Sequence, residues 1–156
     1  MAGLTESRTI GQWVGRIDIS KYFPLADRSV LLARLNSYHI DSEVLIFNEL
    51  DRIGGLSTLR GHDEQSIRAS SYAVSTFEYR FLTGERSYLN AFTDYGIIAA
   101  RTEQLKDESQ YYGFGIGAAL DTGAGVLGLS YALGSQIGQP IIFSTGKVHL
   151  GYAAIF

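Results

Sequence analysis

The chain has 156 residues, a net charge of -3 and no cysteine, and it contains 18 glycines, 10 tyrosines and 8 phenylalanines beside 2 prolines. The absence of cysteine excludes disulfides, thiolate metal sites and a cysteine nucleophile. The acidic balance, without a run of Lys or Arg, leaves no electrostatic footprint for nucleic acid. Glycine and aromatic residues with so little proline favour a fold of many strands.

Neither the N-terminus nor the longest uncharged stretch predicts a membrane-spanning helix. The first residues, MAGLTESRTI, lack the basic and apolar regions of a signal peptide. Residues 122–146 carry no charge and are long enough to span a bilayer. Glycines, Pro140 and alternating apolar residues interrupt that stretch, so we do not expect it to form a helix.

Alternation of apolar and polar residues predicts most of the secondary structure. Residues 1–10 show it weakly and are a candidate eighth strand. Clear alternation predicts strands over residues 11–19 and 29–40, with a turn between them at KYFPLADR, where Pro24 fixes the bend. A polar loop with several glycines follows over about residues 41–66.

The second half of the chain continues the same pattern. Strands are predicted over residues 67–82 and 87–99, joined by a Thr-Gly-Glu-Arg turn, and a charged connection is predicted over residues 101–110. The alternation tightens from Tyr111 onwards. It predicts the last three strands over residues 111–120, 126–134 and 147–156, which makes seven strands in all.

The two faces of these strands indicate the environment of the sheet. One face carries a continuous row of aliphatic and aromatic side chains, whereas the other is polar or carries Gly, Ala and Ser. In a soluble sandwich the second face would meet water, and so many small residues would make a poor solvated surface. Strands of about ten residues with these faces suit a lipid-facing wall around a small or polar lumen. We therefore predict an all-β fold, an antiparallel transmembrane β-barrel.

Three motifs in order, LRGH at residues 59–62, AFTDYG at residues 91–96 and KVHLGYAAIF at residues 147–156, carry a family resemblance. The chain resembles the C-terminal barrel half of the outer-membrane assembly and translocation family that includes BamA and FhaC, the bacterial surface antigen family. In that family a long extracellular loop with a [VIL]-R-G-[FYH] tip enters the lumen of a sixteen-stranded barrel. A later strand carries F-x-D-x-G, and the chain ends in a strand with a terminal Phe.

The resemblance implies that residues 1–156 form an outer-membrane barrel segment, the C-terminal seven or eight strands of a larger barrel. It also implies that the loop at about residues 41–66 folds inward. The chain departs from the family pattern in two respects. His62 stands where Phe or Tyr is commoner, and the strands of the first barrel half and the periplasmic domains are not represented.

Arg60 and two acids on the inward face are the candidate loop anchor. Alternation places Glu78 and Asp94 inside, and a planar guanidinium can bridge two carboxylates. Gly61 allows a tight backbone turn beside Arg60. The residues alone leave open a second interpretation, a surface arginine in a glycine-rich loop, and the resemblance favours the anchor. It adds four supporting positions in the two motifs, Leu59, His62, Phe92 and Gly96.

The terminal strand carries a second candidate site. Leu150, Tyr152 and Phe156 lie on one face, and they resemble the C-terminal signal that the barrel-assembly machinery reads. The alternative is simply a last strand with an apolar face. Gly151 is expected to weaken the local order of this strand.

No catalytic or cofactor-binding constellation is evident. Gly113, Gly115 and Ala118 fit a lax dinucleotide pattern, but the strand-to-helix context is missing, and closely approaching strand glycines explain them better. The three histidines have no metal-ligand spacing, and no serine lies in a nucleophile elbow. We therefore expect no enzyme activity, no cofactor and no metal.

The leading functional hypothesis is a non-enzymatic outer-membrane segment of a machine that inserts or translocates polypeptides, in a Gram-negative bacterium or a derived organelle. The resemblance implies a weak seam at which a client strand pairs with the last strand by β-augmentation. Expected partners are the bilayer, polypeptide clients, the barrel-assembly machinery, and a missing barrel half or another copy of the chain. The last follows because lipid does not tolerate two open sheet edges.

Two other hypotheses remain open at this point. A small closed eight-stranded outer-membrane barrel would serve as a structural anchor. Its interior would hold side chains only, so Arg60 would stay outside. A soluble ligand-binding barrel would need no detergent.

Overall fold

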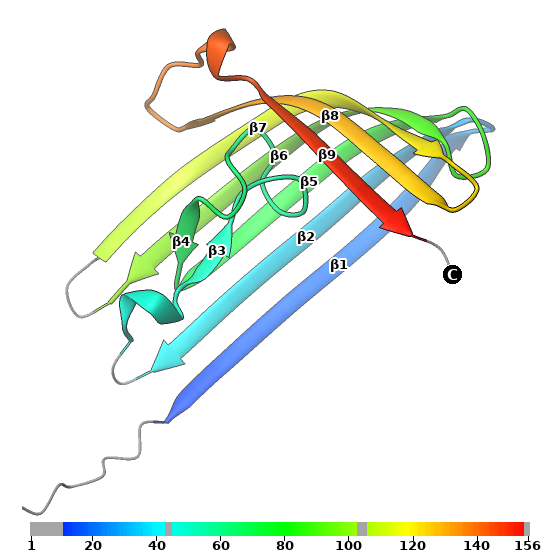
Figure 1. Ribbon diagram of the computed structural model, residues 1–156. Coiled ribbons are helices and arrows are strands. Elements are labelled where there is room, and N and C mark those ends of the chain that lie inside the picture. Colours follow the sequence, from blue (N-terminus) through cyan, green and yellow to red (C-terminus); the bar gives the residue numbers. More distant parts are fainter. Residues whose placement is uncertain (1–10, 43–44, 103–105, 155–156) are drawn as a thin grey trace, which may run out of the picture.

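The computed structural model describes residues 11–42, 45–102 and 106–154. Seven antiparallel strands form one curled sheet in these residues (Figure 1). The strands of this sheet lie side by side in the order in which they occur along the chain. Their bounds are β1 (Gln12–Ala26), β2 (Ser29–Ser42), β5 (Ser71–Leu82), β6 (Tyr88–Arg101), β7 (Lys106–Asp121), β8 (Gly125–Gln136) and β9 (Lys147–Ala154). The predicted all-β antiparallel fold is confirmed. Within the described ranges the sheet is not closed, because β1 and β9 are its two edges and do not pair.

The connections at the two ends of the strands differ in length. Short turns follow β1, β5 and β7 at one end, which we call the short-turn end. Longer connections follow β2 and β8 at the other end, the long-loop end. Short turns face the periplasm and longer loops the exterior in outer-membrane barrels. Both edge strands, β1 and β9, run from the long-loop end towards the short-turn end.

Two predicted boundaries are wrong, each for a physical reason. The turn expected at residues 21–28 shrinks to Asp27 and Arg28, because β1 continues through Pro24. A proline is tolerated there because β1 is an edge strand and has one side without a ladder partner. The charged connection expected at residues 101–110 is also shorter, because β7 begins at Lys106 and pairs with the end of β6.

The long loop between β2 and β5 has secondary structure of its own. It contains a 3₁₀ helix (Phe47–Glu49) and a two-stranded sheet of β3 (Asp51–Ile53) and β4 (Ile67–Ala69). The predicted strand at residues 67–82 is therefore two strands, interrupted at Ser70. Backbone N–H groups of Ile40 and Ser70 bond across this break to Ser70 and Ala99 carbonyls at 2.9 and 2.8 Å.

The core lies between this loop and the inner face of the sheet, towards which the β3–β4 pair is folded (Figure 1). Its buried members are Tyr38, Ile40, Ile53, Leu59, Ala69, Tyr72, Val74 and Ile98. Near the long-loop end, the inner face thus carries large apolar side chains and not the small or polar ones that were predicted. The loop supplies the apolar partner that makes large inward side chains stable there.

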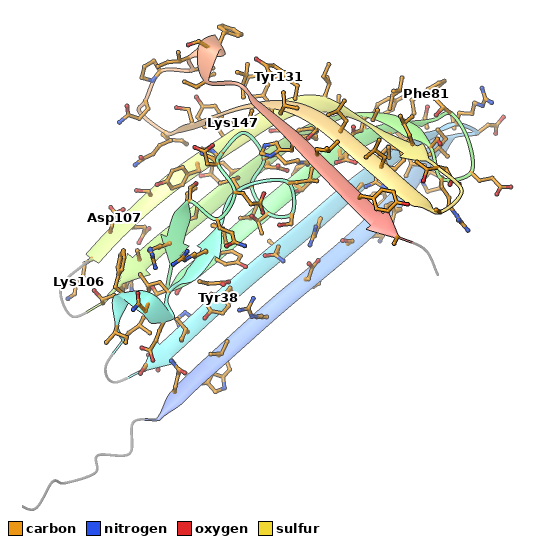
Figure 2. The ribbon with its side chains drawn as sticks, in the orientation of Figure 1. Tyr38, Phe81, Lys106, Asp107, Tyr131 and Lys147 are labelled. Atoms are coloured by element: carbon orange, nitrogen blue, oxygen red, sulfur yellow. The ribbon has the colours of Figure 1, made fainter. Side chains whose placement is uncertain are left out.

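The outer face carries large exposed apolar side chains on every strand (Figure 2), among them Trp13, Leu35, Phe77, Ile97, Ile116, Tyr131 and Leu150. Across the described parts of the chain, no helix has the length and apolar character needed to cross a membrane. Six strands of the main sheet, β1, β2 and β5 to β8, have 12 to 16 residues. They exceed the 9–11 residues or so that a tilted strand needs to cross the hydrocarbon layer.

Candidate functional site

The loop places Arg60 against two acids of the inner wall. Its guanidinium donates from Nε and Nη2 to the two carboxylate oxygens of Asp94, at 2.8 Å each, and from Nη1 to Glu78 Oε2 at 2.6 Å. The backbone N–H of Arg60 donates to the same Asp94 carboxylate at 3.1 Å. Asp94 therefore receives a bidentate fork and a main-chain donor from one loop residue, which fixes the position and the direction of the loop tip.

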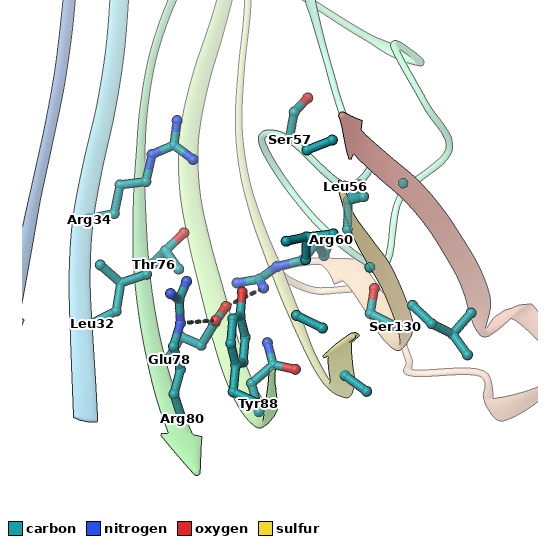
Figure 3. A pocket seen from close by; sticks show the side chains of 18 of the residues that line it. Leu32, Arg34, Leu56, Ser57, Arg60, Thr76, Glu78, Arg80, Tyr88 and Ser130 are labelled. Atoms are coloured by element: carbon teal, nitrogen blue, oxygen red, sulfur yellow. Dashed lines mark hydrogen bonds and ion pairs between the residues drawn. The ribbon is translucent and has the colours of Figure 1, made fainter. Parts of the chain in front are cut away.

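Neighbouring side chains complete this network. Thr76 Oγ1 donates to Asp94 Oδ1 at 2.8 Å. Figure 3 shows Glu78 between Arg60 and Arg80, and Arg80 Nε donates to Glu78 Oε1 at 2.8 Å. Phe92 lies under the guanidinium, with Arg60 Cζ 3.4 Å from its ring centroid. The aromatic face adds a cation–π contact to the ion pairs.

The three charged groups of this network are removed from water. Asp94 is 0 % exposed, Glu78 4 % and Arg60 8 %. Burial by itself lowers the pKa of Arg60, but the hydrogen bonds and charges of Asp94 and Glu78 outweigh it and raise the pKa. Arg60 therefore stays charged, and its removal would leave two buried carboxylates with no cation of the loop beside them.

Close contacts of the main chain hold the loop tip next to Arg60. Gly61 has a φ of +88°, a conformation that favours glycine, and a Cβ there would lie 2.6 Å from the Leu133 carbonyl carbon of β8. His62 Nε2 lies 3.2 Å from the Tyr112 carbonyl oxygen, to which the neutral ring donates. The His62 ring also packs edge-on against Tyr111, at 5.4 Å between centroids.

Two strand glycines, Gly113 and Gly134, lie under the loop tip, and the sequence predicted a close approach only for Gly113. A Cβ on Gly113 of β7 would collide with the Arg60 carbonyl oxygen. A Cβ on Gly134 of β8 would lie 2.7 Å from the Gly61 carbonyl oxygen. Their alternation with large residues was visible in the sequence, but nothing there linked them to a loop fifty or more residues away.

The inward side of β9 contacts the loop at three alternate residues. Lys147 Nζ lies 2.7 Å from Asp63 Oδ1. His149 Nε2 accepts a hydrogen bond from the Gly61 N–H at 3.3 Å. A Cβ on Gly151 would lie 2.6 Å from Leu56 Cδ2, so the missing side chain makes room for the loop. From the sequence, Gly151 was expected only to weaken the local order of the strand.

The remaining candidate residues are placed as follows. Leu59 is fully buried in the core, and a Cβ on Gly96 would be 3.7 Å from Leu59 Cδ1. Leu150 and Tyr152 are exposed on the outer face of β9. Phe156 and the candidate eighth strand at residues 1–10 lie outside the described residues.

A cavity of about 430 Å³ lies below the Arg60 network, lined among others by Arg34, Arg80, Tyr88 and Ser130 (Figure 3). Its arginines already have acidic partners, since Arg34 pairs with Asp18 and Arg80 with Glu78. The charges of the wall are therefore balanced. No group of three or more His, Asp or Glu in the described ranges could hold a metal ion.

Comparison with known proteins identifies the family. The chain matches the Omp85 superfamily domain over residues 13–148. No match was found among curated proteins or among solved structures. Members of this superfamily are non-catalytic barrels of the outer membrane of bacteria and organelles, with roles in protein assembly and translocation, which confirms the prediction of a non-enzymatic protein. The chain belongs to the Omp85 superfamily.

Proposed function

We propose that this chain is the barrel segment of a machine that inserts or translocates polypeptides across the outer membrane of a Gram-negative bacterium or a derived organelle. The loop at residues 41–66 folds inward and is anchored by Arg60, and β9 offers its free edge to a client strand. The family supports the general role. The observation that carries the mechanism is the buried fork from Arg60 to Asp94 and Glu78.

The anchor is strong because its parts depend on one another. Removing one partner of a buried ion pair costs about 3–5 kcal/mol, since the charge left behind is uncompensated. Arg60 is the cation that the loop supplies to both acids, whereas Arg80 of the wall reaches only Glu78. Loss of Arg60 therefore leaves the Asp94 carboxylate, which is 0 % exposed, without its cation.

Replacement of Arg60 by alanine tests the anchor. We expect Arg60→Ala to release the loop and to raise the rate of protease cleavage within residues 41–66 by more than about tenfold, the equivalent of 1.4 kcal/mol. Arg60→Lys should restore little, because an ammonium cannot make the bidentate fork. Arg52→Ala is the matched control, as Arg52 is an exposed arginine of the same loop. Equal cleavage of the Arg60 and Arg52 variants would remove the basis for the anchor.

The second part of the mechanism rests on the position of β9. It pairs with β8 on one side over eight residues, and its other side has no strand partner in the described sheet. Unpaired N–H and C=O groups on such an edge bind an extended segment by β-augmentation. We extend the proposal to its outward residues Leu150 and Tyr152, which with Phe156 would form the signal for the barrel-assembly machinery.

Photo-crosslinking tests the edge. Leu150 of β9 and Leu129 of β8 are directly opposite each other, and both are exposed on the outer face. A photoreactive residue at position 150 should capture an unfolded outer-membrane protein added as the probe, because a strand paired with β9 would lie beside it. The same group at position 129 is one strand further away and should capture much less. Equal capture at both positions would contradict pairing at this edge.

The small closed barrel is disfavoured by the place of Arg60. That hypothesis leaves the loop outside, whereas Arg60 is buried against the inner wall.

A further inference from the structure

The connection between β8 and β9, residues 137–146, differs in charge from the other connections at the long-loop end. It belongs to a stretch, residues 122–146, that has no charged residue. The loop between β2 and β5 carries several charges, and the connection between β6 and β7 carries Glu103 and is flanked by Arg101 and Lys106. Instead, this connection exposes four large apolar side chains, with Phe143 the most exposed at 77 %; they are Ile137, Ile141, Ile142 and Phe143.

The connection folds over the outer face of β8. Inward positions of β8 are known from Gly134, which meets the loop tip, so Tyr131 and Ser135 point outward. Tyr131 Oη donates to the Phe143 carbonyl at 3.4 Å, and Ser135 Oγ lies 3.2 and 3.4 Å from the carbonyl oxygens of Gln139 and Pro140. Figure 1 shows the segment leaving the sheet away from the β3–β4 hairpin. It therefore continues the apolar outer wall that Tyr131, Val148 and Leu150 present.

Several main-chain groups of this connection are also hydrogen-bonded. Besides those three carbonyls, backbone donors bond within the segment or to its neighbours: Ile137 to Gln110, Gln139 to Gln136, Thr145 to Ile142 and Gly146 to Phe143, at 2.8 to 3.2 Å. The hydroxyl of Thr145 donates to the Ile142 carbonyl at 2.8 Å. Each such bond reduces the cost of lipid contact, because lipid offers no partners to backbone groups. A loop that projects into water does not need such bonds.

We propose that residues 137–146 lie against the barrel wall in the membrane, with Ile141, Ile142 and Phe143 among the acyl chains of the leaflet on the long-loop side. The partner is the lipid itself. Aromatic and aliphatic side chains at this depth behave like those of an interfacial segment, whose binding grows with the apolar area buried. The segment ends at β9, so lipid contact would also fix one end of the edge strand.

Tryptophan reporters test this placement. The chain has one tryptophan, Trp13, so Trp13→Phe gives a silent background for Phe143→Trp. In vesicles of phosphatidylcholine brominated on the acyl chains, we expect strong quenching of the reporter at position 143 and little quenching by iodide in the buffer. Phe47→Trp in the same background is the control. Phe47 is an exposed aromatic of the β2–β5 loop, where iodide should quench and brominated lipid should not.

A second label guards against an effect of the tryptophan itself. Ser144 is exposed and the chain has no cysteine, so Ser144→Cys carries a single nitroxide. Its relaxation should respond to oxygen dissolved in lipid more than to a water-soluble nickel complex. Iodide quenching at position 143, or preferential nickel access at position 144, would overturn the proposal. Shielding from both lipid and water would overturn it too, because it would indicate a protein partner. None of these outcomes bears on the Arg60 anchor.

Discussion

At the scale of single residues, the inner wall is a set of buried charges that satisfy one another. Arg60 reaches both Asp94 and Glu78, and Phe92 fills the space beneath its guanidinium. Alternation alone gave the inward direction of both acids, because a strand side chain has only two faces to choose from. The pairing with Arg60 came from the family resemblance. The contacts of His149 and Lys147 could not be predicted, because they depend on where the loop tip ends in space.

His62 makes docking of the loop depend on pH. Burial lowers the pKa of His62 below the usual 6.5, so the docked loop favours the neutral ring. The released loop binds the proton more readily. This contribution to docking is therefore complete above about pH 6.5 and is lost as the pH falls through the lowered pKa of the docked state.

Protease cleavage within residues 41–66, measured from pH 7.5 to pH 5, checks this expectation. Cleavage should accelerate at the acid end, and His62→Gln should flatten the part of the profile that His62 causes, since glutamine can donate to the Tyr112 carbonyl without titrating. His39→Gln is the control, because His39 is an exposed histidine of β2. An unchanged profile in His62→Gln would show that other groups cause the pH dependence.

At the scale of elements, close approach of backbones decides where the loop can lie. β7 and β8 carry glycine at the two positions where the loop main chain comes nearest, Gly113 and Gly134. Strand existence was predictable from the alternation, and all seven strands of the main sheet were anticipated. The small β3–β4 sheet was not, because three-residue strands are too short for a period to show.

Gly113→Ala tests the close approach. The new methyl group would meet the carbonyl of Arg60, a main-chain atom that cannot rotate away. We expect the loop tip to lift, with a loss of about 1–3 kcal/mol of stability as for other overpacked sites, seen as a lower thermal midpoint and faster loop cleavage. Gly128→Ala is the control, since its methyl group would meet only the Gly151 carbonyl oxygen at 3.7 Å. Identical behaviour of the two variants would mean that the loop has room above β7.

At the scale of the whole molecule, the apolar residues are divided between two surfaces. The inner set forms a core with the loop, and the outer set is exposed over the length of the strands. The class of fold was predictable because this division follows directly from the sequence period. The apolar part of the inner face was not predictable, because the alternation within a strand does not reveal which other segment covers its inner side.

The exposed outer wall leads to a simple expectation. Exposed apolar area on this scale exceeds what soluble monomers carry, so the purified chain should aggregate in plain buffer and become monodisperse in detergent. Size-exclusion chromatography with light scattering measures both states and gives the protein mass of the detergent particle. A monodisperse particle without detergent, with its tyrosines and phenylalanines shielded, would contradict the lipid-facing wall.

The shared direction of β1 and β9 restricts what can complete the sheet. If these edges met directly, within one copy or between two copies that supply only these seven strands, they would pair in parallel, and every other pair in the sheet is antiparallel. Closed bacterial barrels of this type have even strand numbers, which keeps every neighbour antiparallel. Parity therefore requires an odd number of further strands between β9 and β1. A complement of one or of nine strands satisfies this rule, and a complement of eight does not.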